Sequence, residues 1–192
     1  NQVLAGFQDA GGSVVIMMLW VSVFGGIMNS MNTFDPLAKF FVKISKNVQQ
    51  LMGWCGILCL VGNAALADEA AQVVTISPII RDVVEKNVEC EDEKAAYALR
   101  VRLATLTSSM GIYGSELIPW HCFPVFFAKI ASSVYPLHEF TAMDIISKNY
   151  MSFIVIGSII ILSFTGLDRF VPMFGLPDKK RVRLKKETAS PV

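Results

Sequence analysis

The sequence is short of charged residues: Asp, Glu, Lys and Arg make up only 17% of the 192 residues, whereas 53% are hydrophobic. Its mean hydropathy is +0.50. A single soluble core of this size cannot absorb so many apolar side chains, so the composition is typical of a membrane protein. The formal net charge is only +1, and no basic face is interleaved with aromatic residues. This scarcity of positive charge argues against a nucleic-acid partner.

The usual marks of a metal site, a disulfide framework or an active site are also missing. The four cysteines form no CxxC pair, and Cys55 and Cys59 lie four residues apart in an apolar run, which is typical of buried small hydrophobes. No nucleophile–base pair or metal-ligand spacing is present, so we expect a protein that is not an enzyme and carries no cofactor. The chain begins at Asn1 without a recognisable signal peptide, and we interpret it as a piece of a longer protein.

Three long segments carry no charge at all. Residues 10–34, 47–67 and 149–167 contain 25, 21 and 19 consecutive uncharged residues, and about 20 helical residues are needed to cross the hydrocarbon core of a membrane. Because a backbone in lipid must satisfy its own hydrogen bonds, we predict transmembrane helices. The fold class predicted is therefore an all-α, polytopic membrane protein. We assign residues 1–177 to a transmembrane domain and residues 178–192 to a basic cytoplasmic tail.

The positions of the basic residues predict an orientation. Six basic residues lie within residues 178–186, and Lys39, Lys43 and Lys46 follow the first predicted span. The excess of Lys and Arg in cytoplasmic loops places both groups in the cytoplasm. Residues 85–93 carry five acidic residues and one lysine, and we predict that they lie on the opposite side, with one crossing between them and Lys46.

Polar residues interrupt the end of the second predicted span. Asn63, Asp68 and Glu69 lie where a helix that is already 15 residues long should still be in or near the membrane. A charge at the bilayer centre costs about 2.5 to 3.5 kcal/mol on insertion scales, so such carboxylates usually serve transport or are paired. The alternative is that Asp68 simply caps the next helix, with Glu69 in its first turn.

A second interruption is the stretch SSMGIYGSELIPWH, residues 108–121. We expect Gly111 and Gly114 to let the backbone leave helical geometry, and Pro119 to lie in the first turn of a new helix. Glu116 would then lie just ahead of a helix N-terminus. The alternative is a surface loop in which Glu116 is an ordinary solvated cap. His121 is predicted one or two turns inside the new helix and ranks below the carboxylates, because a lone histidine there is more often packed than proton-carrying.

These features together predict a cation site. An interrupted helix exposes carbonyl oxygens, and the side chains of Asn63, Ser108, Ser109 and Ser115 add neutral oxygens of the kind that a hard cation prefers. If one carboxylate binds either a proton or the cation, exchange of the two follows. The alternative for the hydroxyl groups is hydrogen bonding to carbonyls of their own helix.

Several motifs resemble those of the NhaC-type sodium/proton antiporter family. They are FGGIM at residues 24–28, the spacing from Asn63 to Asp68 followed by Ser77-Pro78, and above all LIPW at residues 117–120 with Gly111 upstream. The resemblance covers about residues 3–175. It implies a multi-pass transporter of the bacterial inner membrane, built from two inverted repeats with discontinuous helices, of which this chain is the C-terminal one. The family commonly has a Glu-Asp pair where this chain has Ser108 and Ser109.

Our hypothesis from the sequence is therefore a sodium/proton antiporter. Asp68 is the first choice for the competing carboxylate and Glu116 the second, and Glu69 lies beside them. The expected partners are sodium ions, protons, the lipid bilayer and the N-terminal half of the same transporter; a homodimer is left open. Two alternatives remain: an exchanger of organic acids or amino acids, and a non-transporting membrane component whose polar breaks mediate helix association.

Overall fold

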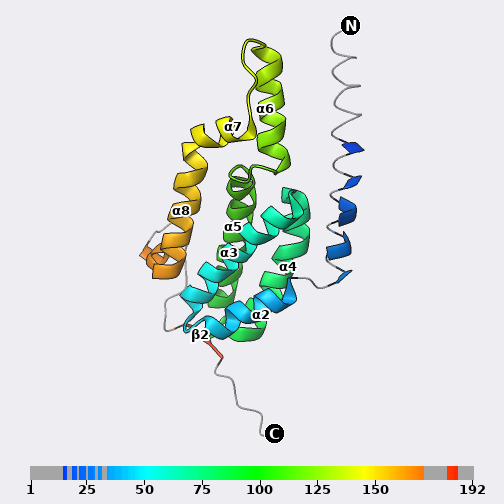
Figure 1. The fold of residues 1–192 in the computed structure, drawn as a ribbon. Coiled ribbons are helices and arrows are strands. Elements are labelled where there is room, and N and C mark those ends of the chain that lie inside the picture. Colours follow the sequence, from blue (N-terminus) through cyan, green and yellow to red (C-terminus); the bar gives the residue numbers. More distant parts are fainter. Residues whose placement is uncertain are drawn as a thin grey trace.

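The computed structural model describes residues 34–170 and 181–185, together with short pieces between residues 15 and 31. The described chain is mainly helical, with two short strands (Figure 1). Its elements are α2 (Asp35–Ile44), α3 (Val48–Leu66), α4 (Glu69–Asn87), β1 (Val88–Cys90), α5 (Glu93–Ser115), α6 (Cys122–Val134), α7 (Ala142–Lys148), α8 (Tyr150–Thr165), η1 (Leu167–Phe170) and β2 (Val182–Leu184). The first predicted span, residues 10–34, lies only partly within the described residues, and its described positions from 15 to 30 are helical.

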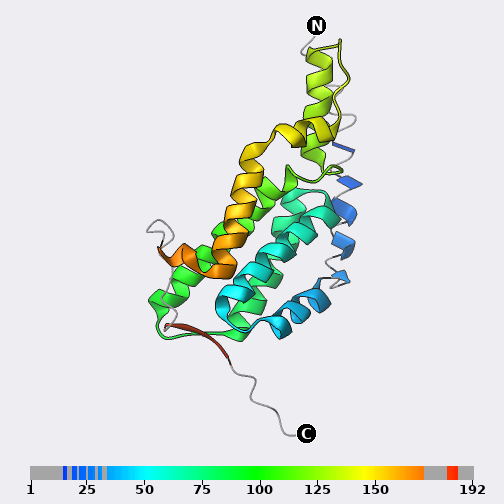
Figure 2. The ribbon, with the colours of Figure 1, turned by 60° about the vertical axis from the view of Figure 1, so that its left-hand side comes forward.

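Helices α3 and α4 form an antiparallel hairpin. Asn47 caps the start of α3, and the helix ends at Ala67, whose φ of 54° is in the left-handed region. Asp68 then caps α4, so the chain reverses direction within two residues. Figures 1 and 2 show α4 returning toward the end of the molecule where α3 begins. The predicted single crossing between Lys46 and residues 85–93 is therefore wrong, because α3 leads away from Lys46 and α4 returns antiparallel to it.

Helix α5 packs against α3, α4 and α8. It runs without interruption from Glu93 to Ser115, so the expectation that Gly111 and Gly114 open the helix is wrong. The interruption comes later, at residues 116–121, before α6 begins at Cys122. Pro119 is thus not in the first turn of the new helix; Pro124 is. A helix interruption is therefore present within residues 108–121, but it lies nearer the C-terminal end of that stretch than predicted.

The core of the bundle is apolar and lies between α3, α4 and α5. Its fully buried side chains include Leu58, Cys59, Ile76, Ile80 and Leu106. Cys55 is also buried, and both Cys55 and Cys59 are free. The prediction that these two cysteines act as small buried hydrophobes is therefore confirmed.

A two-stranded sheet closes the charged end of the bundle. Strand β1 pairs with β2 in antiparallel register, with Glu89 opposite Arg183. The backbone N–H of Glu91 donates to the Arg181 carbonyl at 2.9 Å, and Arg181 forms an ion pair with Asp92. Burial raises the pKa of the Cys90 thiol above its usual value.

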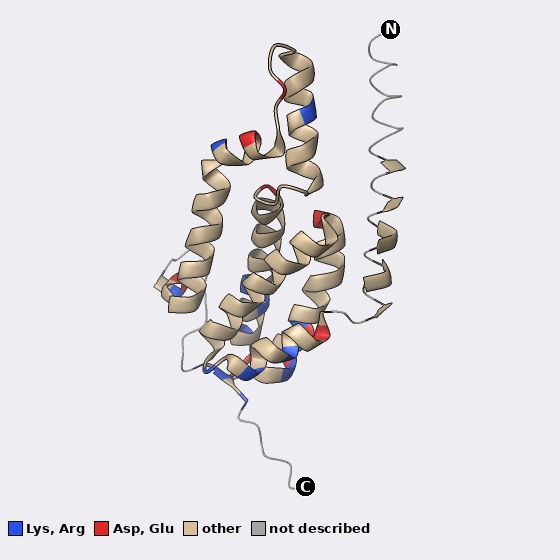
Figure 3. Cartoon of the chain, viewed as in Figure 1, with Lys and Arg blue, Asp and Glu red and all other residues tan. Residues whose placement is uncertain are grey.

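The sheet also corrects the predicted orientation. It joins an acidic segment and a basic segment that we had placed on opposite sides of a membrane. Figure 3 shows many of the Lys, Arg, Asp and Glu residues at this same end of the helical bundle. Net segment charge was misleading here, because acidic residues carry little orienting information and these acids instead pair with nearby cations.

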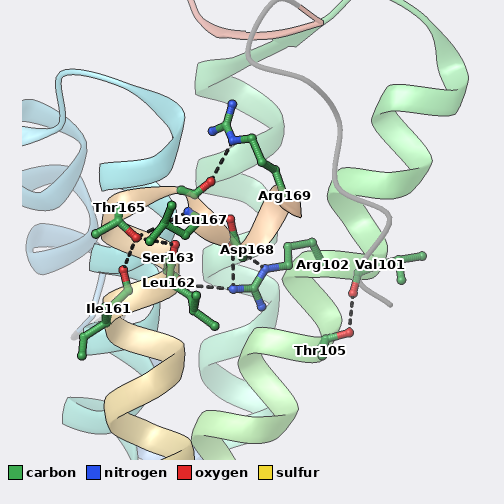
Figure 4. A network of polar contacts seen from close by, with 11 residues as sticks. Val101, Arg102, Thr105, Ile161, Leu162, Ser163, Thr165, Leu167, Asp168 and Arg169 are labelled. Atoms are coloured by element: carbon green, nitrogen blue, oxygen red, sulfur yellow. Dashed lines mark hydrogen bonds and ion pairs between the residues drawn. The ribbon is translucent and has the colours of Figure 1, made fainter. Parts of the chain in front are cut away.

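A buried ion pair connects α5 to the segment after α8 (Figure 4). The Arg102 Nε donates a hydrogen bond to Asp168 Oδ2 at 3.0 Å, and a terminal guanidinium nitrogen lies 2.9 Å from the same oxygen in an ion pair. The same side chain donates to Ser163 Oγ at 2.8 Å. Arg102 and Asp168 are both buried, and the sequence analysis had singled out neither of them.

By length and composition, α3 is the one helix among the described residues that could cross a membrane by itself. It matches the predicted span at residues 47–67. The predicted span at residues 149–167 corresponds to the shorter α8. This helix is long and apolar enough to cross a membrane only when it is joined to α7 across a 65° bend at Asn149. The helical fold is thus confirmed for the described residues.

Candidate functional site

Three helix interruptions are linked to one another in the bundle. They are the α3–α4 turn, the α5–α6 break and the α7–α8 junction. The indole N–H of Trp120, in the second interruption, donates to the Ala64 carbonyl beside the first at 2.7 Å. Asn149 at the third interruption donates from Nδ2 to Glu116 Oε2 in the second at 2.7 Å. The two breaks predicted from sequence therefore lie together, and the third joins them.

Asp68 lies in the first interruption and caps α4. Its Oδ1 accepts a hydrogen bond from the Ala71 backbone N–H at 2.7 Å, and the side chain is half-buried. This is the capping role that we set out as the alternative to ion binding. The cap uses one carboxylate oxygen, and it fixes the position at which the chain turns.

Glu69, Gln72 and Asn63 gather around Gly111 of α5; we call this group the Gly111 junction. Asn63 Nδ2 donates to the Gly111 carbonyl at 2.8 Å. A Cβ atom at Gly111 would lie 2.7 Å from Gln72 Oε1 and 3.6 Å from Glu69 Cγ. Gly111 thus lets side chains from α3 and α4 approach α5 closely, which explains why a glycine stands here although the helix continues.

Two amide side chains in the Gly111 junction are buried and incompletely bonded. Asn63 and Gln72 are both 0% exposed. Among the described residues, Asn63 Oδ1 and both amide atoms of Gln72 have no hydrogen-bond partner, although the weakly polar thiol of Cys59 lies close to Gln72. The sequence analysis missed Gln72; the signal that could have found it is its position three residues after Glu69, on the same helix face.

Glu116 lies in the second interruption and is held by the third. Its Oε2 accepts hydrogen bonds from Asn149 Nδ2 and from Ser152 Oγ. Asn149 Oδ1 in turn accepts from the Ser152 backbone N–H at 3.3 Å, which caps α8. Glu116 is half-buried, so it is not the ordinary solvated loop residue of our alternative. Its role in the structure is to tie the α5–α6 break to α8.

The three serines predicted as neutral ligands all lie in α5. Ser108 is exposed and Ser109 is half-buried. Ser115 is buried, and its hydroxyl donates to the Ile112 carbonyl of its own helix at 2.6 Å. This is the helix-bonding alternative for a hydroxyl in an apolar helix.

His121 is buried at the start of α6. Its Nδ1 accepts from the Phe123 backbone N–H at 3.4 Å, and its ring stacks on Phe123. Nε2 has no hydrogen-bond partner among the described residues. The prediction that His121 lies one or two turns inside the helix is wrong, because it is the residue that caps the helix.

Chemically, the site offers carboxylates and neutral oxygens at helix interruptions inside an apolar bundle. In the part of the chain that the structure describes, no three His, Cys, Asp or Glu side chains are grouped closely enough to hold a metal ion. Of the acids predicted for the site, Asp68 and Glu69 lie at the first interruption and Glu116 at the second. Compared with known proteins, the chain matches no protein-family model, no curated protein and no solved structure.

Proposed function

We propose that the chain is the C-terminal part of a secondary transporter that exchanges sodium ions for protons across a bacterial inner membrane. The observation that carries this proposal is the convergence of three helix interruptions, with Asp68, Glu69 and Glu116 among them. Interrupted helices are where transporters of this kind bind their ions, because the freed backbone and side-chain oxygens line the site. The apolar composition and the resemblance of LIPW to NhaC-type antiporters support the same assignment.

Glu69 is the carboxylate that we assign to the exchange. Asp68 already accepts a hydrogen bond from the backbone of α4, and Glu116 accepts two from α8 and its cap. Those bonds hold the two acids in structural positions, whereas the Glu69 side chain packs against Gly111 beside the buried amides. Asp68, our first choice from the sequence, is reassigned to fixing the turn that presents Glu69.

The exchange needs no covalent step. The Glu69 carboxylate binds either a sodium ion or a proton, since both neutralise the same charge and occupy the same oxygens. If the transporter changes its access from one side of the membrane to the other only when the carboxylate is neutralised, a gradient of one ion drives movement of the other. Glu116 and Trp120 keep the interruptions in register while this happens.

The test is sodium-driven proton movement by the full-length protein in proteoliposomes. A preset pH gradient is followed with a pH-sensitive dye while sodium, lithium, potassium or choline chloride is added. Sodium should collapse the gradient and choline should not, and Glu69→Gln should abolish the response. The matched control is Glu85→Gln, an exposed acid on the same helix that pairs with Arg81, and it should exchange like the wild type.

No response to any cation would contradict the proposal. Competition by carboxylate-bearing solutes would instead favour the exchanger of organic acids or amino acids. If Glu85→Gln loses the response to sodium as completely as Glu69→Gln does, the loss is not specific to Glu69, and the assignment of Glu69 as the exchanging carboxylate is wrong.

A further inference from the structure

We infer that Gln72 and Asn63 supply two neutral amide oxygens to the transported cation at the Gly111 junction, with Glu69 supplying the charge. This inference rests on the proposed function and deepens it, because it names the neutral ligands that hold the ion beside the carboxylate. Four observations of the described residues carry it: burial, unmet hydrogen bonds, amide orientation and the space left by a glycine.

The first two observations concern the cost of burying an amide. Asn63 and Gln72 are fully buried, and three of their four amide atoms have no hydrogen-bond partner among the described residues. A buried polar group without a partner is destabilising, so native proteins rarely keep one unless it serves a ligand, an ordered water or a functional role. Two such groups against the same glycine point to a shared ligand.

The third observation is the orientation of Asn63. Its amide nitrogen faces the carbonyl oxygens of Gly111 and Met110, at 2.8 Å and 3.4 Å. Carbonyl oxygens only accept hydrogen bonds, so the nitrogen and not the oxygen of the amide must face them. Oδ1 therefore does not face these two carbonyls, and it has no hydrogen-bond partner among the described residues. The hydrogen bonds of Asn63 therefore preorganise an oxygen ligand.

The fourth observation is the fit around Gly111. Glu69 and Gln72 are three residues apart on α4, so they lie on one helix face. The Cγ of Glu69 and the Oε1 of Gln72 lie 3.6 Å and 2.7 Å from the position that a Cβ at Gly111 would take. One carboxylate with two amide oxygens suits a monovalent hard cation. A divalent metal generally needs more acidic ligands, and the described residues form no group of three. The geometry therefore favours a small alkali cation such as sodium.

The test compares sodium dependence with stability in Gln72→Met, which keeps the length of the side chain and removes its oxygen. In proteoliposomes, the sodium concentration for half-maximal exchange should rise at least about tenfold. In detergent without sodium, the melting temperature should stay the same or rise, because an unpartnered amide has been removed. Added sodium should raise the melting temperature of the wild type but not that of Gln72→Met.

Two further variants keep the inference falsifiable. Gln72→Glu retains oxygen ligands and should bind sodium at least as tightly as the wild type. Ser77→Ala is the matched control, because its hydroxyl oxygen is another buried polar atom of α4 without a partner among the described residues. Ser77 lies about 7 Å further along the helix, so the sodium dependence of this variant should be unchanged.

The outcomes separate this inference from the proposed function. If the wild type exchanges sodium and Gln72→Met does so at the same half-maximal concentration, the inference is overturned and the function stands. If Gln72→Met has a lower melting temperature and an unchanged sodium dependence, Gln72 is a structural residue and the inference is overturned. If the wild type shows no exchange, the function fails; the inference fails with it if sodium also leaves the melting temperature of the wild type unchanged.

Discussion

Breaking the ion pair between Arg102 and Asp168 should strongly destabilise the bundle. The pair ties α5 to the segment after α8, and the two side chains are only 3% and 10% exposed. Asp168→Asn would keep the shape of the residue and remove the negative charge that faces the buried Arg102 guanidinium. Loss of one partner of a buried pair costs about 3 to 5 kcal/mol, so we expect a loss of this size, with Ser163 still accepting one hydrogen bond.

The measurement is denaturant or thermal unfolding of the protein in detergent. The matched control is Asp82→Asn, which breaks the exposed pair with Lys86, whose side chains are 70% and 57% exposed for Lys86 and Asp82; its cost should be about 0.5 kcal/mol or less. The double variant Arg102→Met with Asp168→Leu should recover most of the lost stability, because it removes both charges. If Asp168→Asn costs no more than Asp82→Asn, the pair is not desolvated as described.

Three further predictions follow from other contacts. Gly111→Ala should lower the free energy of unfolding by about 1 to 3 kcal/mol and should weaken sodium exchange, because the added Cβ would lie 2.7 Å from a buried amide oxygen. Gly157→Ala is the control: a Cβ there would have nothing within 4 Å, so its free energy of unfolding, measured in the same way, should be unchanged or slightly higher. Trp120→Phe should lower the free energy of unfolding by about 0.5 to 1.5 kcal/mol, because α3 loses the 2.7 Å hydrogen bond that the indole donates. An unchanged free energy of unfolding would show that this hydrogen bond does not stabilise the contact between the two breaks. Glu89→Cys together with Arg183→Cys, with the native cysteines replaced, should form a disulfide under mild oxidation, because the two residues are paired across the sheet and paired Cα atoms lie about 4.5 to 5.5 Å apart. Gel mobility reports the disulfide, and either single variant is the control.

The position of α3 could be predicted from the sequence almost to the residue. The uncharged run at residues 47–67 corresponds to Val48–Leu66. Both ends carry a local signal, because Asn47 and Asp68 are helix-capping residues flanking an apolar run. The same local chemistry gave the cap at Asp68, which we had set out as the alternative to ion binding. Reversal of the chain there was missed, because it depends on the single left-handed residue Ala67, and alanine gives no signal for that conformation.

The second interruption was predicted in the right region and placed too early. Gly111 and Gly114 have poor helix propensity, but packing of α5 against α3 and α4 outweighs it, so the helix continues to Ser115. Whether a glycine opens a helix or lets another helix approach depends on its neighbours in space. For Gly111 those neighbours come from residues about 40 positions earlier, and no local pattern reports them.

The contacts that organise the site were the least predictable. Gln72 resembles any polar residue in a helix until its burial against Gly111 is known. Arg102 and Asp168 are 66 residues apart in the sequence. The strands β1 and β2 have only three residues each and are separated by most of the helical bundle, so neither shows the alternating pattern that identifies a longer strand.

The pairing of β1 with β2 also limits how the chain can be threaded through a membrane. Both strands belong to one sheet, so in a bundle that spans a bilayer, as we propose, the polypeptide that leaves β1 returns to the side from which it started. The number of traversals between the two strands is therefore even. Figure 1 shows α5 and α6 leading away from the sheet and α7 and α8 leading back toward it, so the path of the chain agrees with an even number. Any topology with an odd count in this interval would have to pull the sheet apart.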